Sequence, residues 1–222
     1  MTELLPGPTQ MQAPPEPWPV DQRVDFFNST GPSGGHGYRC EGRWMLNSVT
    51  DLCHKSKFLA CAEFDDARER GNFAHDCWGR WLLTGDAGDL GSFAEWIEPL
   101  IAHPLTQGCT AVAVEYRMAD PRYGLAGSLD AVVRNAAGKL LLIDLKTLSE
   151  RGHPNTGPLS VQLGGYISLL GQTWPAVQID ECWALWAKPG STSADRFCPV
   201  HCLTAFEAER QALMRERVKA TF

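Results

Sequence analysis

Apolar residues divide the middle of the chain into three consecutive strand-like segments. Segments 110–118, 125–133 and 140–147 alternate between apolar and polar positions or are almost wholly apolar, and they predict an antiparallel meander. The run LLLID at 140–144 is typical of a strand that is buried on both faces. Turn residues NAAG at 135–138 join the last two segments, so the sequence predicts a β-hairpin there.

Helical patterns surround this meander. A helix is expected to begin near Ser48, and further helices are expected at 63–83, 93–101, 159–170 and 204–218. Shorter strands are expected at 38–45, 179–187 and 196–202. Helices before and after the strands predict an α/β fold, in which a mixed central β-sheet containing the antiparallel hairpin is flanked by helices.

The hairpin carries charges where its pattern predicts burial. Asp144 and Lys146 share one face of the third strand, because side chains alternate along a strand. A turn centred near Ala137 places Asp130 opposite Asp144 on that face, about 4.5–5.5 Å away at Cβ. A buried carboxylate without a partner is strongly unfavourable, so two of them favour a bound divalent cation. Lys146 would then position or deprotonate a water molecule.

Three other polar positions have two interpretations each. His75 lies on the helix expected at 63–83, where an isolated histidine is more often a packed or surface residue than a ligand. Glu115 either adds a third carboxylate to the cluster or is a solvated strand residue. Ser48 and Asp51 resemble a capping box, although a helix N-terminus also binds phosphate.

Composition narrows the class of protein. The 222 residues are 44% hydrophobic and 21% charged, as in a globular protein, and no apolar run is long enough to span a membrane. Residues 1–37 are rich in Pro, Gly, Ser and Thr and are expected to form a flexible tail or wrapping segment, which leaves one domain at 38–222. Because the start lacks a signal-peptide layout and the 8 cysteines are scattered, we expect reduced thiols and a cytoplasmic location. A formal charge of −6 argues weakly against a nucleic-acid partner, unless basic groups cluster locally.

Five motifs in a fixed order make the chain resemble a known family. They are Ser48-Val49-Thr50; Arg70-Gly71 with His75; Glu115; Gly127-Ser128-Leu129-Asp130 followed by Asp144-Leu145-Lys146; and Gln162 with Tyr166, four residues apart. Over about 44–187 the chain resembles PD-(D/E)XK nucleases, specifically the RecB-type, lambda-exonuclease-like branch of single-domain phage and mitochondrial exonucleases. The resemblance implies a restriction-endonuclease-like fold and hydrolysis of phosphodiester bonds at DNA ends, in recombination, replication or repair.

The resemblance also implies roles for individual residues. The implied metal ligands are His75, Asp130, Asp144 and the backbone carbonyl of Leu145. The implied catalytic residues are Lys146, Asp130, Asp144, Glu115 and Gln162. The implied DNA contacts are Ser48, Arg70 and Tyr166.

Cofactor and partners follow from this chemistry. One or two Mg²⁺ or Mn²⁺ ions are expected, because hard oxygen ligands suit them. Linear duplex or single-stranded DNA is the expected partner, bound through its phosphates and largely independently of sequence. A second copy of the chain or a recombination protein is a further expected partner, and no membrane is expected.

Other interpretations stay open. A catalytically inactive module that binds DNA ends or a partner would keep the same fold, and a restriction-type endonuclease would cut closed circles. An iron–sulfur relative of the CRISPR-adaptation nuclease would use late cysteines, here Cys182, Cys198 and Cys202. Cys198 and Cys202 are one residue too far apart for the C-x-x-C spacing, so no cluster is expected. Zinc bound by Cys198, His201 and Cys202 is another alternative.

Overall fold

The computed structural model describes the backbone of residues 16–27, 37–53 and 62–220, and the side chains of these residues except 62–65 and 216–220. Its helices are α1 (Val49–Cys53), α2 (Ala62–Thr84), α3 (Ala94–Ile101), α4 (Gly157–Thr173) and α5 (Pro199–Ala220), with a 3-10 turn, η1 (Gly91–Phe93). Its strands are β1 (Val24–Phe27), β2 (Gly37–Cys40), β3 (Arg43–Trp44), β4 (Asn47–Ser48), β5 (Thr110–Asp120), β6 (Leu125–Arg134), β7 (Leu140–Thr147), β8 (Glu181–Lys188) and β9 (Ser191–Phe197).

A mixed sheet of six strands forms the centre of the fold. Its order is β4-β6-β7-β8-β9, and β5 pairs with β6. β6 is antiparallel to both β5 and β7, which confirms the predicted meander. β8 runs parallel to β7 after the α4 crossover, and β9 forms an antiparallel hairpin with β8.

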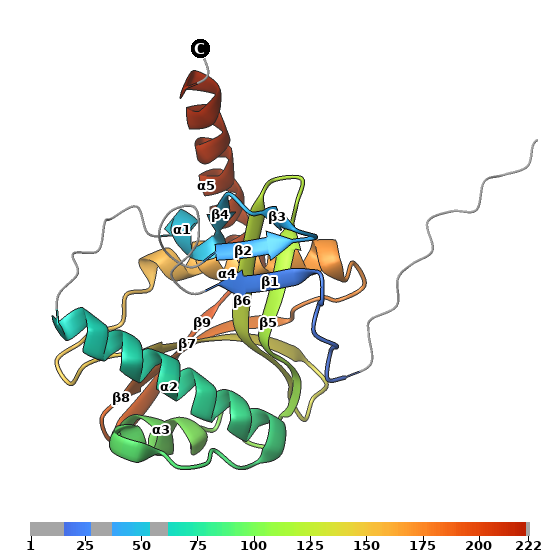
Figure 1. Cartoon of the computed structure of the whole chain (residues 1–222). Coiled ribbons are helices and arrows are strands. Elements are labelled where there is room, and N and C mark those ends of the chain that lie inside the picture. The colour runs from blue at the N-terminus through green and yellow to red at the C-terminus, as the bar shows by residue number, and fades with distance from the viewer. Residues whose placement is uncertain (1–15, 28–36, 54–61, 221–222) are drawn as a thin grey trace, which may run out of the picture.

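Helices cover both faces of this sheet (Figure 1). On one face, Leu163 of α4 packs in a cluster with Val132 and Leu142. On the other face, Trp78 of α2 packs in a cluster that includes Leu145. Fully burying such side chains stabilises a fold by about 1.5–3 kcal/mol each. The hairpin is therefore covered on both sides, as its apolar run predicts.

Residues 16–27 follow the second of the two expectations for this stretch, a wrapping segment rather than a flexible tail. Trp18 is buried, and β1, β2 and β3 form a small antiparallel sheet. Val24 and Tyr38 lie in an apolar cluster with Ala126 of the main sheet. The composition of this stretch hides these few apolar residues, whose burial is favourable enough to hold it on the sheet. Residues 1–15 and 28–36, which the same expectation covered, lie outside the described residues.

The C-terminal region corrects one expectation. The strand expected at 196–202 is wrong, because β9 ends at Phe197 and α5 begins at Pro199. Gly190, at φ +68, provides the turn from β8 into β9, and proline favours the first turn of a helix. The polar sequence of β9 conceals an edge strand that only pairing with β8 defines. Across the described residues, no helix is long and apolar enough to cross a membrane.

Candidate metal centre

Two carboxylates lie where β6 and β7 separate. The ladder between these strands ends at Ala131 and Ile143, so Asp130 and Asp144 are the next residues beyond the last pair. This register agrees with the predicted opposition of the two aspartates. The Leu145 N–H donates to Asp130 Oδ2 at 2.6 Å, in place of a ladder partner. The hairpin thus opens into a polar end.

Asp144 and Lys146 form an ion pair on β7. Their Oδ2 and Nζ atoms lie 2.6 Å apart, and the Asp144 side chain is 0% exposed, whereas that of Lys146 is 32% exposed. Among the described residues, Asp144 Oδ1 has no hydrogen-bond partner. A buried carboxylate oxygen in this state is strongly unfavourable, so the arrangement favours a cationic ligand at this point.

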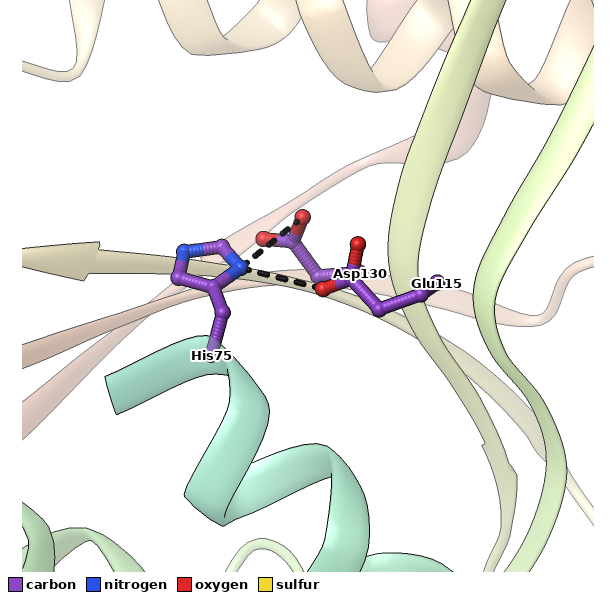
Figure 2. Close-up of side chains that lie close together, drawn as sticks. All are labelled: His75, Glu115 and Asp130. Carbon is purple, nitrogen blue, oxygen red and sulfur yellow. Dashed lines mark hydrogen bonds and ion pairs between the residues drawn. The ribbon is translucent and has the colours of Figure 1, made fainter. Parts of the chain in front are cut away.

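Helix α2 positions His75 beside Asp130, at the end of the β6–β7 ladder. Its Nε2 lies 3.1 Å from the Leu145 carbonyl oxygen, and its Nδ1 lies 3.2 Å from Glu115 Oε1 and 3.4 Å from Asp130 Oδ1. Figure 2 shows the imidazole pointing from α2 toward both carboxylates. Gly79, one turn after His75, lets the helix approach β5 closely, because a Cβ there would lie 2.9 Å from Val114. A glycine four residues after His75 is a sequence signal for this approach.

Glu115 reaches the cluster through an unusual backbone conformation. Its φ is +46, in the left-handed region, and the register of β5 shifts between Ala111 and Ala113. The flanking pairs Val114–Ala131 and Tyr116–Leu129 place Glu115 opposite Asp130. A non-glycine residue in this conformation costs about 1–3 kcal/mol and is concentrated at functional sites. Glu115 combines its two interpretations, because its carboxylate belongs to the cluster while its side chain is 49% exposed.

The residues fit a hard divalent cation. One ligand atom each from His75, Glu115 and Asp130 lies within 4.8 Å of the other two. The Leu145 carbonyl lies 3.1 Å from the other ring nitrogen, Nε2, where it holds the imidazole so that Nδ1 points to the two carboxylates. Carboxylates suit hard divalent cations and an imidazole suits transition-metal ions, so these groups form a candidate cation site without selecting one ion. This cluster does not include Asp144, which the resemblance implies as a ligand, although Asp144 has the unpartnered oxygen.

The pKa shifts of the clustered residues also favour binding of a cation at this site. Burial lowers the pKa of His75, but Asp130 and Glu115 together outweigh it and raise the pKa to about 9. Burial raises the pKa of Asp144 to about 6, even though Lys146 opposes this change. Burial also raises the pKa of Asp130, against the effects of His75 and Lys146. The metal-free cluster therefore holds protons that a cation would displace.

A cleft of about 620 Å³ opens above the cluster. Its lining includes His75, Glu115, Asp130, Lys146, Gln162 and Tyr166, together with Phe26, Tyr38, Thr50, Arg68, Arg117 and Ser128. Gln162 Nε2 donates to the Tyr166 hydroxyl at 2.9 Å, while Gln162 Oε1 is buried without a partner among the described residues. The helix face predicted from their spacing thus borders the site.

Two of the predicted DNA contacts are not in the lining of this cleft. Ser48 and Asp51 form the reciprocal capping box, with hydrogen bonds of 2.7 and 3.0 Å, which accounts for Ser48 without a ligand. Arg70 lies over the Trp96 ring, 5.3 Å from its centroid, between α2 and α3. Arg68 and Arg117 instead line the cleft, where they add positive charge to that of Lys146. Arg117 follows Glu115 by two residues, which is the signal that sequence reasoning missed.

The late cysteines form a different environment. Cys182 and Cys202 are buried, and their thiols hydrogen-bond to each other, which raises the pKa of Cys182. Cys198 and His201 are exposed. Within the described part of the chain, Cys198, His201 and Cys202 do not form a group of converging metal ligands. The alternative zinc site is therefore not assembled.

Comparison with known proteins adds little to this geometry. No family model and no curated protein matches the chain. A solved structure titled "Crystal structure of SSO0001" is similar at 16% identity over 75% of each chain, with a TM-score of 0.34. So low a TM-score carries no argument. The fold and site define a mixed α/β protein whose cleft holds a candidate metal centre.

Proposed function

We propose that this protein is a metal-dependent DNA exonuclease of the PD-(D/E)XK type. One observation carries the proposal: His75, Glu115 and Asp130 converge in a cleft that Lys146 also lines, and Lys146 is paired with the buried Asp144. Carboxylates, an imidazole and a lysine at the open end of a β-hairpin suit phosphodiester hydrolysis. The order of motifs in the sequence favours the same chemistry.

The residues have distinct roles in this reaction. Asp130, Glu115 and His75 would hold the cation, and the Leu145 carbonyl, 3.1 Å from His75 Nε2, would orient the imidazole. Asp144, which has an unpartnered oxygen, lies outside this group of three. A bound Mg²⁺ or Mn²⁺ ion supplies charge stabilisation for the transition state and lowers the pKa of water. Asp144 and Asp130 raise the pKa of Lys146 above its usual value, against the effect of burial. Lys146 therefore stays protonated, donates hydrogen bonds, and positions the attacking water or a phosphate oxygen.

The cleft wall supports a phosphate chain. Arg68 and Arg117 provide positive charge, and Tyr38 and Ser128 provide hydroxyl groups, the first donating to the second at 3.2 Å. Contacts of this kind bind the backbone of DNA without reading its sequence. Gln162 and Tyr166 border the same cleft from α4, which suits a role in holding the strand that carries Asp144 and Lys146.

The test is product analysis on linear DNA labelled separately at each end, with Mn²⁺ and with EDTA. We expect metal-dependent release of nucleotides from wild type, and a loss of about 10²-fold or more in Lys146→Ala, because misplacing a reacting group has a cost of that order. Lys139→Ala is a matched control, because Lys139 lies at the other end of the hairpin and also pairs with a carboxylate, Glu181, at 2.8 Å. Control activity should be unchanged.

Three results would contradict the proposal. Wild type that binds DNA without forming products would indicate a non-catalytic module. Rapid cutting of closed circular DNA would indicate an endonuclease. Full activity in Lys146→Ala would remove this lysine from the mechanism.

A further inference from the structure

β5 is irregular just where it reaches the metal ligands. Its register against β6 shifts at Val112, and three residues later Glu115 has φ +46. Both features weaken the ladder that normally fixes a strand. A left-handed glutamate persists only where the surrounding structure determines its backbone. β6 still pairs with β5 on both sides of these two points, so other contacts there add to a ladder that is locally interrupted.

The N-terminal strap, defined here as residues 16–23, contacts both irregular points. The Trp18 N–H donates to the Val112 carbonyl at 2.7 Å, so the carbonyl of the shifted residue keeps a partner. The Trp18 ring packs edge-on against Tyr116, with centroids 5.7 Å apart and planes at 74°. Tyr116 directly follows Glu115, so Trp18 contacts β5 three residues before Glu115 and again at the residue after it.

The strap and Tyr116 are each tied to neighbouring elements. Glu16 forms an ion pair with Arg134 at the end of β6. The Tyr116 hydroxyl accepts a hydrogen bond of 3.0 Å from Trp174 Nε1, at the end of α4. The Trp18 side chain is only 5% exposed, which favours a single position for its ring. Val112–Tyr116 is thus held between the strap and the sheet.

We infer that the strap positions Glu115 for metal binding, with Trp18 as the positioning residue. Trp18 belongs to the core beside Tyr116 and is not among the residues that line the cleft. It acts through the backbone of β5, by satisfying the Val112 carbonyl and fixing Tyr116. The inference rests on the proposed function in one respect, that the His75–Glu115–Asp130 cluster binds a divalent cation.

A double-mutant cycle on metal affinity separates positioning from simple packing. Mn²⁺ binding is measured by calorimetry for wild type, Trp18→Ala, Glu115→Ala and the double variant. We expect Trp18→Ala to weaken binding about 10-fold, as outer-shell changes typically do. If Trp18 acts through Glu115, the double variant binds no more weakly than Glu115→Ala alone. Additive effects, or unchanged affinity in Trp18→Ala, would overturn the inference.

Two further variants control for stability. Phe206→Ala removes another buried aromatic ring, packed against Gly164 and Gly165 of α4, and should leave Mn²⁺ affinity unchanged. Trp18→Leu keeps apolar volume but loses the edge-on ring contact, so it tests the inference even if Trp18→Ala does not fold. Folding of each variant is checked by circular dichroism and thermal unfolding.

Amide hydrogen exchange in EDTA provides a readout that needs no metal. Trp18→Leu should speed exchange in residues 112–118 of β5 while leaving 140–147 of β7 unchanged. Exchange in β5 equal to wild type would overturn the inference, whatever the protein binds. If wild type binds Mn²⁺ and degrades DNA, and the Trp18 variants have the same Mn²⁺ affinity and β5 exchange as wild type, only the positioning role of the strap is refuted. A wild type without metal binding or nuclease activity would refute the proposed function.

Discussion

Asp144→Asn should stabilise the metal-free protein. The Asp144 carboxylate is fully buried, and its Oδ1 has no hydrogen-bond partner among the described residues. Burial raises its pKa from 3.8 to about 6, although Lys146 opposes this change. A tenfold change in an ionisation constant corresponds to about 1.4 kcal/mol, so ionised Asp144 costs the fold about 3 kcal/mol. The neutral asparagine avoids that cost.

The pH dependence has a definite sign. A carboxyl group with a raised folded-state pKa contributes stability below its unfolded value of 3.8, and this stability is lost as pH rises through about 6. The advantage of Asp144→Asn should therefore grow between pH 5 and 7.5 and stay constant above. About 3 kcal/mol corresponds to roughly 6–12 °C in Tm for a chain of this size.

The assay is urea unfolding in EDTA at pH 5 and 7.5, followed by thermal unfolding with and without Mn²⁺. Mn²⁺ should raise the Tm of wild type, because a ligand that binds only the folded state stabilises it, and should raise that of the variant less. Asp120→Asn is the matched control, since Asp120 is also buried but accepts hydrogen bonds of 3.0 and 2.9 Å from the Arg122 side chain. It should lose about 1–3 kcal/mol. An Asp144→Asn protein less stable than wild type in EDTA at pH 7.5 would refute the reasoning.

Three further predictions concern the cleft and the helices. Because the pKa of His75 is about 9 without metal, Mn²⁺ should bind more tightly as pH rises from 6.5 to 8.5, and a flat calorimetric profile would contradict this competition. Gly164→Ala should destabilise by several kcal/mol in urea unfolding, since its Cβ would lie 2.0 Å from a carbonyl oxygen of α5, whereas Gly171→Ala on the same helix meets nothing within 4 Å and should be neutral or stabilising. Arg117→Ala should weaken DNA binding by Lys146→Ala protein and lower its salt slope by about 0.7–0.9, measured by fluorescence anisotropy, whereas Arg196→Ala, whose guanidinium pairs with Glu181, should leave both unchanged.

Much of the hairpin could be predicted from the sequence, because its geometry is local. Turn residues at 135–138 fix the pairing of β6 with β7, and strand alternation then fixes which side chains share a face. The opposition of Asp130 and Asp144, and the proximity of Lys146 to Asp144, follow from these two rules. Gln162 and Tyr166 are likewise neighbours because helix geometry places residues four apart on one face.

The composition of the cleft depended on contacts between distant segments. Arg70 and His75 lie on the same helix, α2, and local rules predict both positions equally well. Arg70 nevertheless stacks on Trp96 of α3 and does not line the cleft, because tertiary packing decides which side of a helix faces the site. The Ser48 hydroxyl does not line the cleft, because it accepts a hydrogen bond from the Asp51 N–H and caps its own helix. Neither outcome has a local signature.

The position of Glu115 shows most clearly what the sequence predicts and what only tertiary packing decides. Alternation along β5 identified a carboxylate beside the hairpin and left open whether it is solvated. Its left-handed backbone arises from a register shift against β6 and from packing under a strap nearly 100 residues earlier in the chain. Local periodicity was thus sufficient to predict that the two carboxylates and the lysine of the hairpin lie close together. Only the tertiary structure brought His75 and Glu115 to them, because the distance of closest approach between elements depends on side-chain volume at every contact.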